Sequence, residues 1–135
     1  MMEEQAQREE LLQDAVAAVD VVGVILGCCR RDPRYLFGAY EWLLAEGLEY
    51  TTREYLKLTD ATRRHMSGRE IALGLRQLAQ QQFGALARDV WAHWGIRRSR
   101  DWGEVVYNLI NAGLLHKTDH DRIEDFDDIY PVESL

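Results

Sequence analysis

The hydrophobic pattern opens with a long apolar segment over residues 15–29, in which Asp20 is the only charged residue. At this length a helix that is apolar on nearly every side is typical of a core helix, because fifteen residues are too few to span a bilayer. The pattern therefore predicts an apolar N-terminal helix within residues 1–30, running from about Glu3 to Cys29. Gly23 and Gly27 are expected to weaken and kink it.

A second helix is predicted from the turn at Asp32-Pro33 to about Lys57. Aspartate is a favoured N-cap, and proline is favoured at the first helical position. Gly47 falls on the apolar face of this helix, where a residue without a side chain indicates close approach by another helix. The whole face consists of Leu36, Tyr40, Leu43, Leu44 and Gly47.

The most specific local signal is the capping box at Ser67-Gly68-Arg69-Glu70, which follows a polar connector over residues 58–66. In such a box the first and fourth side chains satisfy each other's backbone N–H groups. Met66 and Ile71 are placed to add a hydrophobic staple. The box predicts a third helix that starts at residue 68 and stops near Gly84, with Ile71, Leu75, Leu78 and Ala79 facing inward.

Two shorter helices are predicted over residues 85–94 and from Ser99 to Gly113. Gly95-Ile96 fits a glycine C-cap with a trailing apolar contact, and Ser99 is the expected N-cap of the next helix. The fold class is therefore mainly α, a compact helical domain of five to six helices. Its C-terminal half resembles a helix-turn-helix or winged helix, with the charged residues behind Leu114-Leu115 as the wing. For the last segment a short helix and a strand both fit the pattern.

Composition favours a single domain over residues 1–135, since 47% of the residues are hydrophobic and the chain has only ten glycines and two prolines. The net charge is −7, and the C-terminal segment 119–135 alone holds seven acidic residues and one arginine. An acidic protein disfavours non-specific binding to nucleic acid, which rests on counterion release by a basic surface.

The two cysteines, Cys28 and Cys29, are adjacent, and a disulfide between neighbours would strain the bond geometry. They are predicted to be free thiols in a reducing compartment. The acidic N-terminus also differs from a secretory signal, which begins with positive charge. We therefore expect a cytoplasmic protein without a membrane partner.

The candidate partner-binding surface is the turn between the last two helices together with the outer face of the final one. Arginines beside tryptophans can stack on bases or bind an acidic partner. Asp101 and Glu104 on the same face would oppose phosphates, so protein binding suits the charge better than DNA binding. The alternative is that the arginines neutralise the acidic C-terminal segment within the fold. The candidate residues are Trp94, Arg97, Arg98, Arg100, Tyr107, Asn108 and Asn111.

Catalytic signals are weak along the whole chain. His116 and His120, with Asp119 and Asp121, could coordinate a metal if their segment were helical, but no third ligand stands at a fixed spacing. The sequence contains neither a nucleophile-elbow motif nor a phosphate-cradling glycine loop. No catalytic residue, metal ligand or cofactor is therefore predicted.

These observations favour a non-enzymatic protein-interaction or regulatory module that binds an unknown protein partner. Nucleic-acid binding through the winged-helix-like half is the alternative, and a small metal-dependent enzyme is the third hypothesis. Self-association is a further expectation, because the apolar N-terminal helix exceeds what a core of this size can cover.

Several short motifs, in order along the chain, give the sequence a family resemblance. It is similar to a family of small uncharacterised conserved proteins of the planctomycete–verrucomicrobial group, over about residues 31–130. Trp102 stands where the resemblance leads us to expect phenylalanine. The resemblance implies a stand-alone bacterial domain and brings no activity, cofactor or catalytic residue. The motifs are Arg31-Asp32-Pro33-Arg34-Tyr35, Glu46-Gly47-Leu48-Glu49-Tyr50-Thr51, His65-Met66-Ser67-Gly68, His93-Trp94-Gly95-Ile96, Asp101-Trp102-Gly103-Glu104-Val105-Val106-Tyr107-Asn108-Leu109, Ala112-Gly113-Leu114-Leu115, Asp125-Phe126 and Asp128-Ile129-Tyr130.

Overall fold

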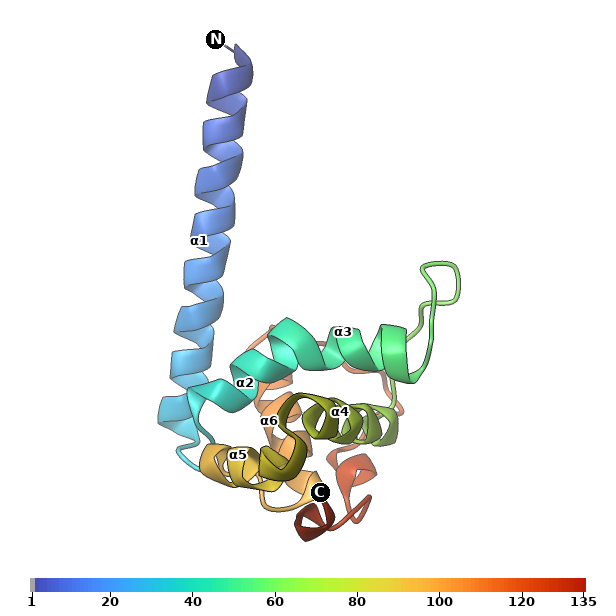
Figure 1. The fold of residues 1–135 in the computed structure, drawn as a ribbon. Coiled ribbons are helices and arrows are strands. Elements are labelled where there is room, and N and C mark those ends of the chain that lie inside the picture. Colours follow the sequence, from blue (N-terminus) through green and yellow to red (C-terminus); the bar gives the residue numbers. More distant parts are fainter. Residues whose placement is uncertain (1) are drawn as a thin grey trace.

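The computed structural model describes residues 2–135, with the side chains of residues 14–19 outside that description. Its first element, α1 (Met2–Arg31), is an uninterrupted helix that projects from the rest of the molecule (Figure 1). Only its C-terminal turns reach the body, where Ile25 and Cys28 are buried. The expected kink at Gly23 and Gly27 is therefore wrong. The core-helix prediction for residues 15–29 holds at Ile25 and Cys28 but is wrong at Val22 and Leu26, which are 45% and 46% exposed, and the side chains of residues 15–19 lie outside the described part of the chain.

The second helical segment combines α2 (Phe37–Trp42) and α3 (Leu48–Tyr50) with π-helical turns at Leu43–Gly47 and Thr51–Tyr55. Thr51 and Thr52 donate their hydroxyl hydrogens to the carbonyls of Gly47 and Leu48, at 2.8 and 2.9 Å. Threonine commonly makes such bonds to the carbonyl four residues earlier within a helix, and here they add to the backbone bonds of the segment. The segment therefore runs as one rod from residue 37 to residue 55.

The predicted start of this helix at Asp32-Pro33 is wrong, because the helix begins at Phe37 after a turn. The Asp32 carboxylate accepts hydrogen bonds from the Arg34 guanidinium (2.8 Å) and from Nδ2 of Asn108 (2.9 Å). The carboxylate is thus engaged by the neighbouring Arg34 and by Asn108, which is distant in the sequence, rather than by a helix N-terminus.

The capping box is confirmed at the start of α4 (Gly68–Phe83). The Glu70 amide donates to the Ser67 hydroxyl (3.1 Å), and the Ser67 amide donates to the Glu70 carboxylate (2.9 Å). The close approach at Gly47 is also confirmed. A Cβ added to Gly47 would lie 2.5 Å from Cδ2 of Leu75 on α4.

The next two helices are α5 (Ala87–Trp94), preceded by a 3-10 turn at Gly84–Leu86, and α6 (Ser99–Asn111). Gly95 ends α5 in the left-handed region at φ 95°, and Gly113 follows α6 at φ 85°, as the glycine positions predict. Ser99 is not the N-cap of α6. The Asp101 carboxylate instead accepts the backbone N–H groups of Arg97 (2.8 Å) and Arg98 (2.9 Å).

Of the two structures expected for the C-terminal segment, a short helix or a strand, the described residues form short 3-10 helical turns and no strand. Residues 112–135 contain 3-10 turns at Ile123–Phe126 and Val132–Ser134, and their only ladder contact is an isolated bridge between Arg98 and Pro131. The expected wing is therefore wrong, since no β-hairpin follows α6 within the described residues. The Ser99 hydroxyl helps to hold this segment, because it donates to the Phe126 carbonyl (2.7 Å).

The core is centred on aromatic rings where α2, α5 and α6 meet. The Trp42 ring lies 5.5 Å from both Trp94 and Trp102, and Trp91 lies 5.3 Å from Trp102. The fold is therefore mainly α, with no strand within residues 2–135. Among the helices described, none has both the length and the apolar character needed to cross a membrane.

Candidate functional site

The predicted surface residue Trp94 serves the core rather than an exposed face. Its ring is half-buried and packs 5.5 Å from Trp42 and 6.1 Å from Phe83, while its carbonyl accepts the Leu36 amide (3.1 Å). The contacts tie the end of α5 to the start of α2. Trp94 therefore positions the turn.

The three turn arginines differ in how far they are engaged. Arg100 donates to both carboxylate oxygens of Asp127 (3.0 Å) and lies 3.4 Å from Glu104, and the Asp127 bond raises the pKa of its guanidinium. Arg100 is therefore paired with the acidic C-terminal segment, as the alternative interpretation of the arginines expects. Arg97 and Arg98 have exposed side chains, and Arg98 lies 4.0 Å from Asp101.

The helical part of the predicted surface splits between two sides of α6. Asn108 donates to Asp32 (2.9 Å) and to the Tyr40 hydroxyl (3.0 Å), and with exposed Asn111 it lines a cleft against α1. Tyr107 faces a separate pocket. The predicted residues therefore do not form one continuous face, and their contact with a partner stays a prediction.

The carboxylates of Asp32 and Asp101 connect several elements of this region through hydrogen bonds, a role that the sequence alone does not predict. Asp101 is buried, and it accepts the hydroxyl hydrogen of buried Tyr35 at 2.6 Å in addition to the two turn amides. Burial, together with this bond, raises the pKa of the Tyr35 phenol. The Arg34 guanidinium lowers the pKa of Asp32 to about 2.

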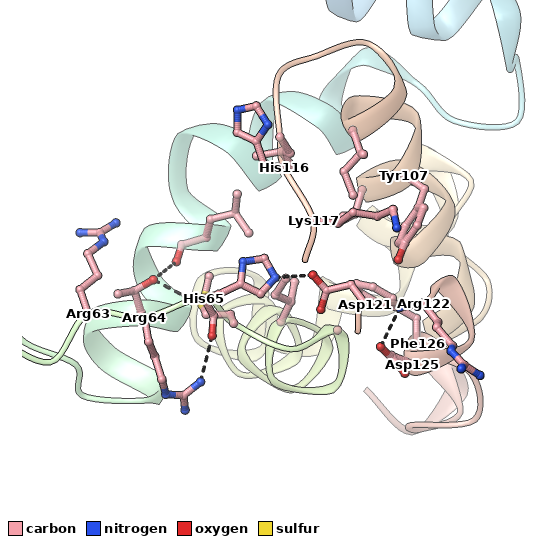
Figure 2. Close-up of a pocket in the computed structure, with 18 residues that line it drawn as sticks. Arg63, Arg64, His65, Tyr107, His116, Lys117, Asp121, Arg122, Asp125 and Phe126 are labelled. Atoms are coloured by element: carbon pink, nitrogen blue, oxygen red, sulfur yellow. Dashed lines mark hydrogen bonds and ion pairs between the residues drawn. The ribbon is translucent and has the colours of Figure 1, made fainter. Parts of the chain in front are cut away.

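A pocket opens between the second helical segment, the start of α4, α6 and residues 115–126 (Figure 2). At its polar edge the ring Nε2 of His65 lies 2.5 Å from the Asp121 carboxylate, which links the connector to the C-terminal segment. The apolar wall is made by Leu48, Ile71, Val106, Ile110, Leu115 and Phe126. The polar edge is made by Arg63, Arg64, His65, His116, Lys117, Asp121, Arg122 and Asp125.

No local sequence pattern predicts this pocket, because its residues come from segments about 40 to 60 positions apart. His65 and Asp121 are separated by 56 residues, and no local spacing connects them. Of the histidines considered for a metal, His116 lines the pocket, and its segment is not helical. The described residues contain no group of three or more histidine, cysteine or acidic side chains able to hold a metal ion.

The largest exposed apolar side chains of the described chain are concentrated on α1. Leu11 and Leu12 lie on the projecting half, and Val22 and Leu26 are 45% and 46% exposed nearer the body. Beside them an apolar groove is lined by Val21, Val22, Ile25, Phe37, Leu44 and Leu114. This combination makes α1 the most prominent candidate contact surface.

Comparisons with known proteins add no relative: no family model, curated protein or solved structure matches the chain. The family resemblance therefore stays a prediction from the sequence motifs.

Proposed function

We propose that this protein is a non-enzymatic protein-interaction module whose contact element is α1. The observation that supports the proposal most directly is the projection of α1, with exposed leucines, from a folded body (Figure 1). At 30 residues the helix is about 45 Å long, and only its last turns pack on the body. Helical stability in proteins comes mainly from packing an apolar face. We therefore expect the projecting half of α1 to be stabilised by packing against a partner.

The partner that fits α1 best is a second copy of the same helix. Residues at alternating spacings of three and four form a single stripe along it, which is the pattern of a coiled-coil seam. Leu12, Val22 and Leu26 are the exposed members of this stripe whose side chains are described. The full stripe is Leu12, Ala15, Val19, Val22, Leu26 and Cys29.

Charge selects the antiparallel orientation of the two helices. The first turn of α1 carries Glu3 and Glu4, and its last turn carries Arg30 and Arg31. If Leu12 lies opposite Val22 of the second copy, each glutamate lies opposite one of these arginines. A parallel pair would instead place like charges together, which destabilises pairing.

The second copy would also cover the groove beside α1. In the antiparallel register the acidic half of one helix lies along the C-terminal half of the other, where the groove residues Val22 and Ile25 stand. Pairing would therefore bring Leu12 of one copy onto Val22 of the other, beside the groove, and remove both side chains from water, which apolar burial favours by about 25 cal/mol per Å².

The test is the mass of the full chain in solution, measured by light scattering after size-exclusion chromatography over a range of concentrations. The proposal expects a dimer of the 15.7 kDa chain that Leu12→Glu converts to a monomer. Leu86→Glu is the matched control, because Leu86 is comparably exposed but lies before α5. A wild-type chain that is monomeric at every concentration would refute the second copy as partner.

Orientation is tested by cysteine cross-linking in a Cys29→Ser background. An equimolar mixture of Leu12→Cys and Val22→Cys chains should oxidise mainly to the mixed disulfide in an antiparallel pair. Predominant formation of the two like-with-like disulfides would show a parallel pair and overturn the charge argument.

A further inference from the structure

The pocket of Figure 2 is independent of the contact role of α1, because none of its lining residues belongs to that helix. Its volume is about 200 Å³, and its apolar wall comes from α4, α6 and Phe126. A dry apolar cavity of about 150 Å³ is sufficient to hold benzene. The pocket therefore has room for a single ring with one small substituent.

One polar group on the wall lacks a partner. The Tyr107 hydroxyl is buried and makes no hydrogen bond to any described residue. Buried tyrosine hydroxyls usually find a partner, and an unmade bond costs about 1–3 kcal/mol. Burial, followed by the nearby Asp121 and Asp125, raises the pKa of the phenol, so that it remains a hydrogen-bond donor at neutral pH.

The groups at the edge that are free to bind a ligand are mostly hydrogen-bond donors. Arg63 and Arg64 are paired with Glu49 and Glu70, but Lys117 and Arg122 take part in no ion pair among the described residues. The acids at the edge are already occupied as hydrogen-bond acceptors. Asp121 accepts the Thr118 amide (2.7 Å), and Asp125 accepts the Arg122 amide (3.0 Å).

We propose that this pocket binds a small ring-bearing carboxylate. The ring lies against Val106, Ile110 and Phe126, while the carboxylate accepts the Tyr107 hydroxyl hydrogen and is held by the charges of Lys117 and Arg122. A multiply charged phosphate fits less well, because much of the wall is apolar and would not replace the water that phosphate loses.

Benzoate is the probe, added to the ¹⁵N-labelled full chain and followed by amide chemical shifts. Saturable shifts should be confined to residues of the pocket. Benzyl alcohol, which is neutral and similar in shape, should bind about tenfold more weakly, as expected for the loss of charge-assisted hydrogen bonds. Shifts scattered over the surface, or equal binding of the two compounds, would overturn the proposal.

Variants separate anion recognition from a general effect of charge. Lys117→Gln with Arg122→Gln should raise the benzoate Kd about tenfold. The matched control is Arg88→Gln with Arg97→Gln, which removes two charges from exposed positions outside the pocket and should leave the Kd unchanged. Equal effects of the two double variants would count against the site.

Tyr107→Phe provides a second readout that a purely structural tyrosine would not give. Because the hydroxyl is unsatisfied in the free protein, its removal should leave the unfolding midpoint unchanged or raise it, while benzoate binding weakens several-fold. Unchanged benzoate binding by this variant would remove the proposed hydrogen bond. A dimer that persists while benzoate fails to bind would refute this inference and leave the role of α1 standing.

Discussion

Replacement of Asp101 by alanine should be the most destabilising single change to the turn between α5 and α6. The carboxylate accepts three hydrogen bonds, from Tyr35 (2.6 Å), from the Arg97 amide (2.8 Å) and from the Arg98 amide (2.9 Å). A hydrogen bond to a charged group contributes about 1.5–3 kcal/mol, and loss of a helix cap costs about 1 kcal/mol. Since such terms are not additive, we expect Asp101→Ala to lower the free energy of unfolding by about 3–5 kcal/mol.

Urea unfolding followed by tryptophan fluorescence measures this effect, since all four tryptophans lie in or beside the aromatic core. Tyr35→Phe removes one of the three bonds and should cost about 1–2 kcal/mol. Asp60→Ala, at an exposed position in the connector, should stay within about 0.5 kcal/mol of wild type.

A double-mutant cycle gives the sharper test. Once Asp101 is alanine, the Tyr35 hydroxyl has already lost its acceptor, so adding Tyr35→Phe should cost almost nothing more. The coupling free energy should therefore be about 1–2 kcal/mol. Additive effects of the two changes would refute the bond as the reason for the stability of the turn.

Three further predictions concern other parts of the fold. Gly47→Ala should lower the free energy of unfolding in urea by about 1–3 kcal/mol, because the added Cβ would lie 2.5 Å from Leu75. Gly23→Ala, which has open space around it, should raise that free energy by about 0.5–1 kcal/mol. Equal effects of the two changes would contradict the close approach at Gly47. The hydrogen bond from Arg64 lowers the pKa of Glu70 from 4.5 to about 2, so the ionised Glu70 stabilises the fold above about pH 4.5 and this stabilisation is lost as the pH falls towards 2. The free energy of unfolding, measured from pH 6 to pH 2, should show this loss. Arg64→Gln should make the loss smaller. Arg97→Gln with Arg98→Gln should change the free energy of unfolding by less than about 0.5 kcal/mol, since both side chains are exposed and Arg98 lies 4.0 Å from Asp101. A larger loss would show that the two arginine charges stabilise the turn.

The parts of the fold that the sequence predicts correctly are those decided by neighbouring residues. Ser67 and Glu70 cap the same helix three positions apart, and Gly95 and Gly113 take positive φ angles that few other residues tolerate. The close packing at Gly47 is predictable too, because glycine lowers helix propensity and buries no side chain, a cost that close contact with a second helix offsets. Each of these signals is complete within a few residues of the chain.

The incorrect boundaries arise where a side chain that could cap a helix bonds to another part of the fold. Asp32 bonds to Asn108, 76 residues away, and Ser99 bonds to the Phe126 carbonyl, 27 residues away. Either side chain could have capped a helix, and the local pattern contains no information about the competing partner. The pocket was missed for the same reason, since His65 and Asp121 meet only in the folded chain.

The C-terminal segment and α1 differ in how much of their apolar surface packs on the body. Phe126 fits against Gly68 and Gly103, and the Tyr130 hydroxyl donates to the Ala72 carbonyl (2.9 Å), so this acidic segment covers apolar surface of α4 and α6. An apolar pattern along a helix does not distinguish burial in its own core from burial against another chain. By contrast, α1 packs on the body only through residues near its C-terminal end, such as Ile25 and Cys28, and leaves Leu11 and Leu12 exposed. Within the segment that predicted a core helix, the exposed residues Val22 and Leu26 are therefore the ones that we expect to find at an interface.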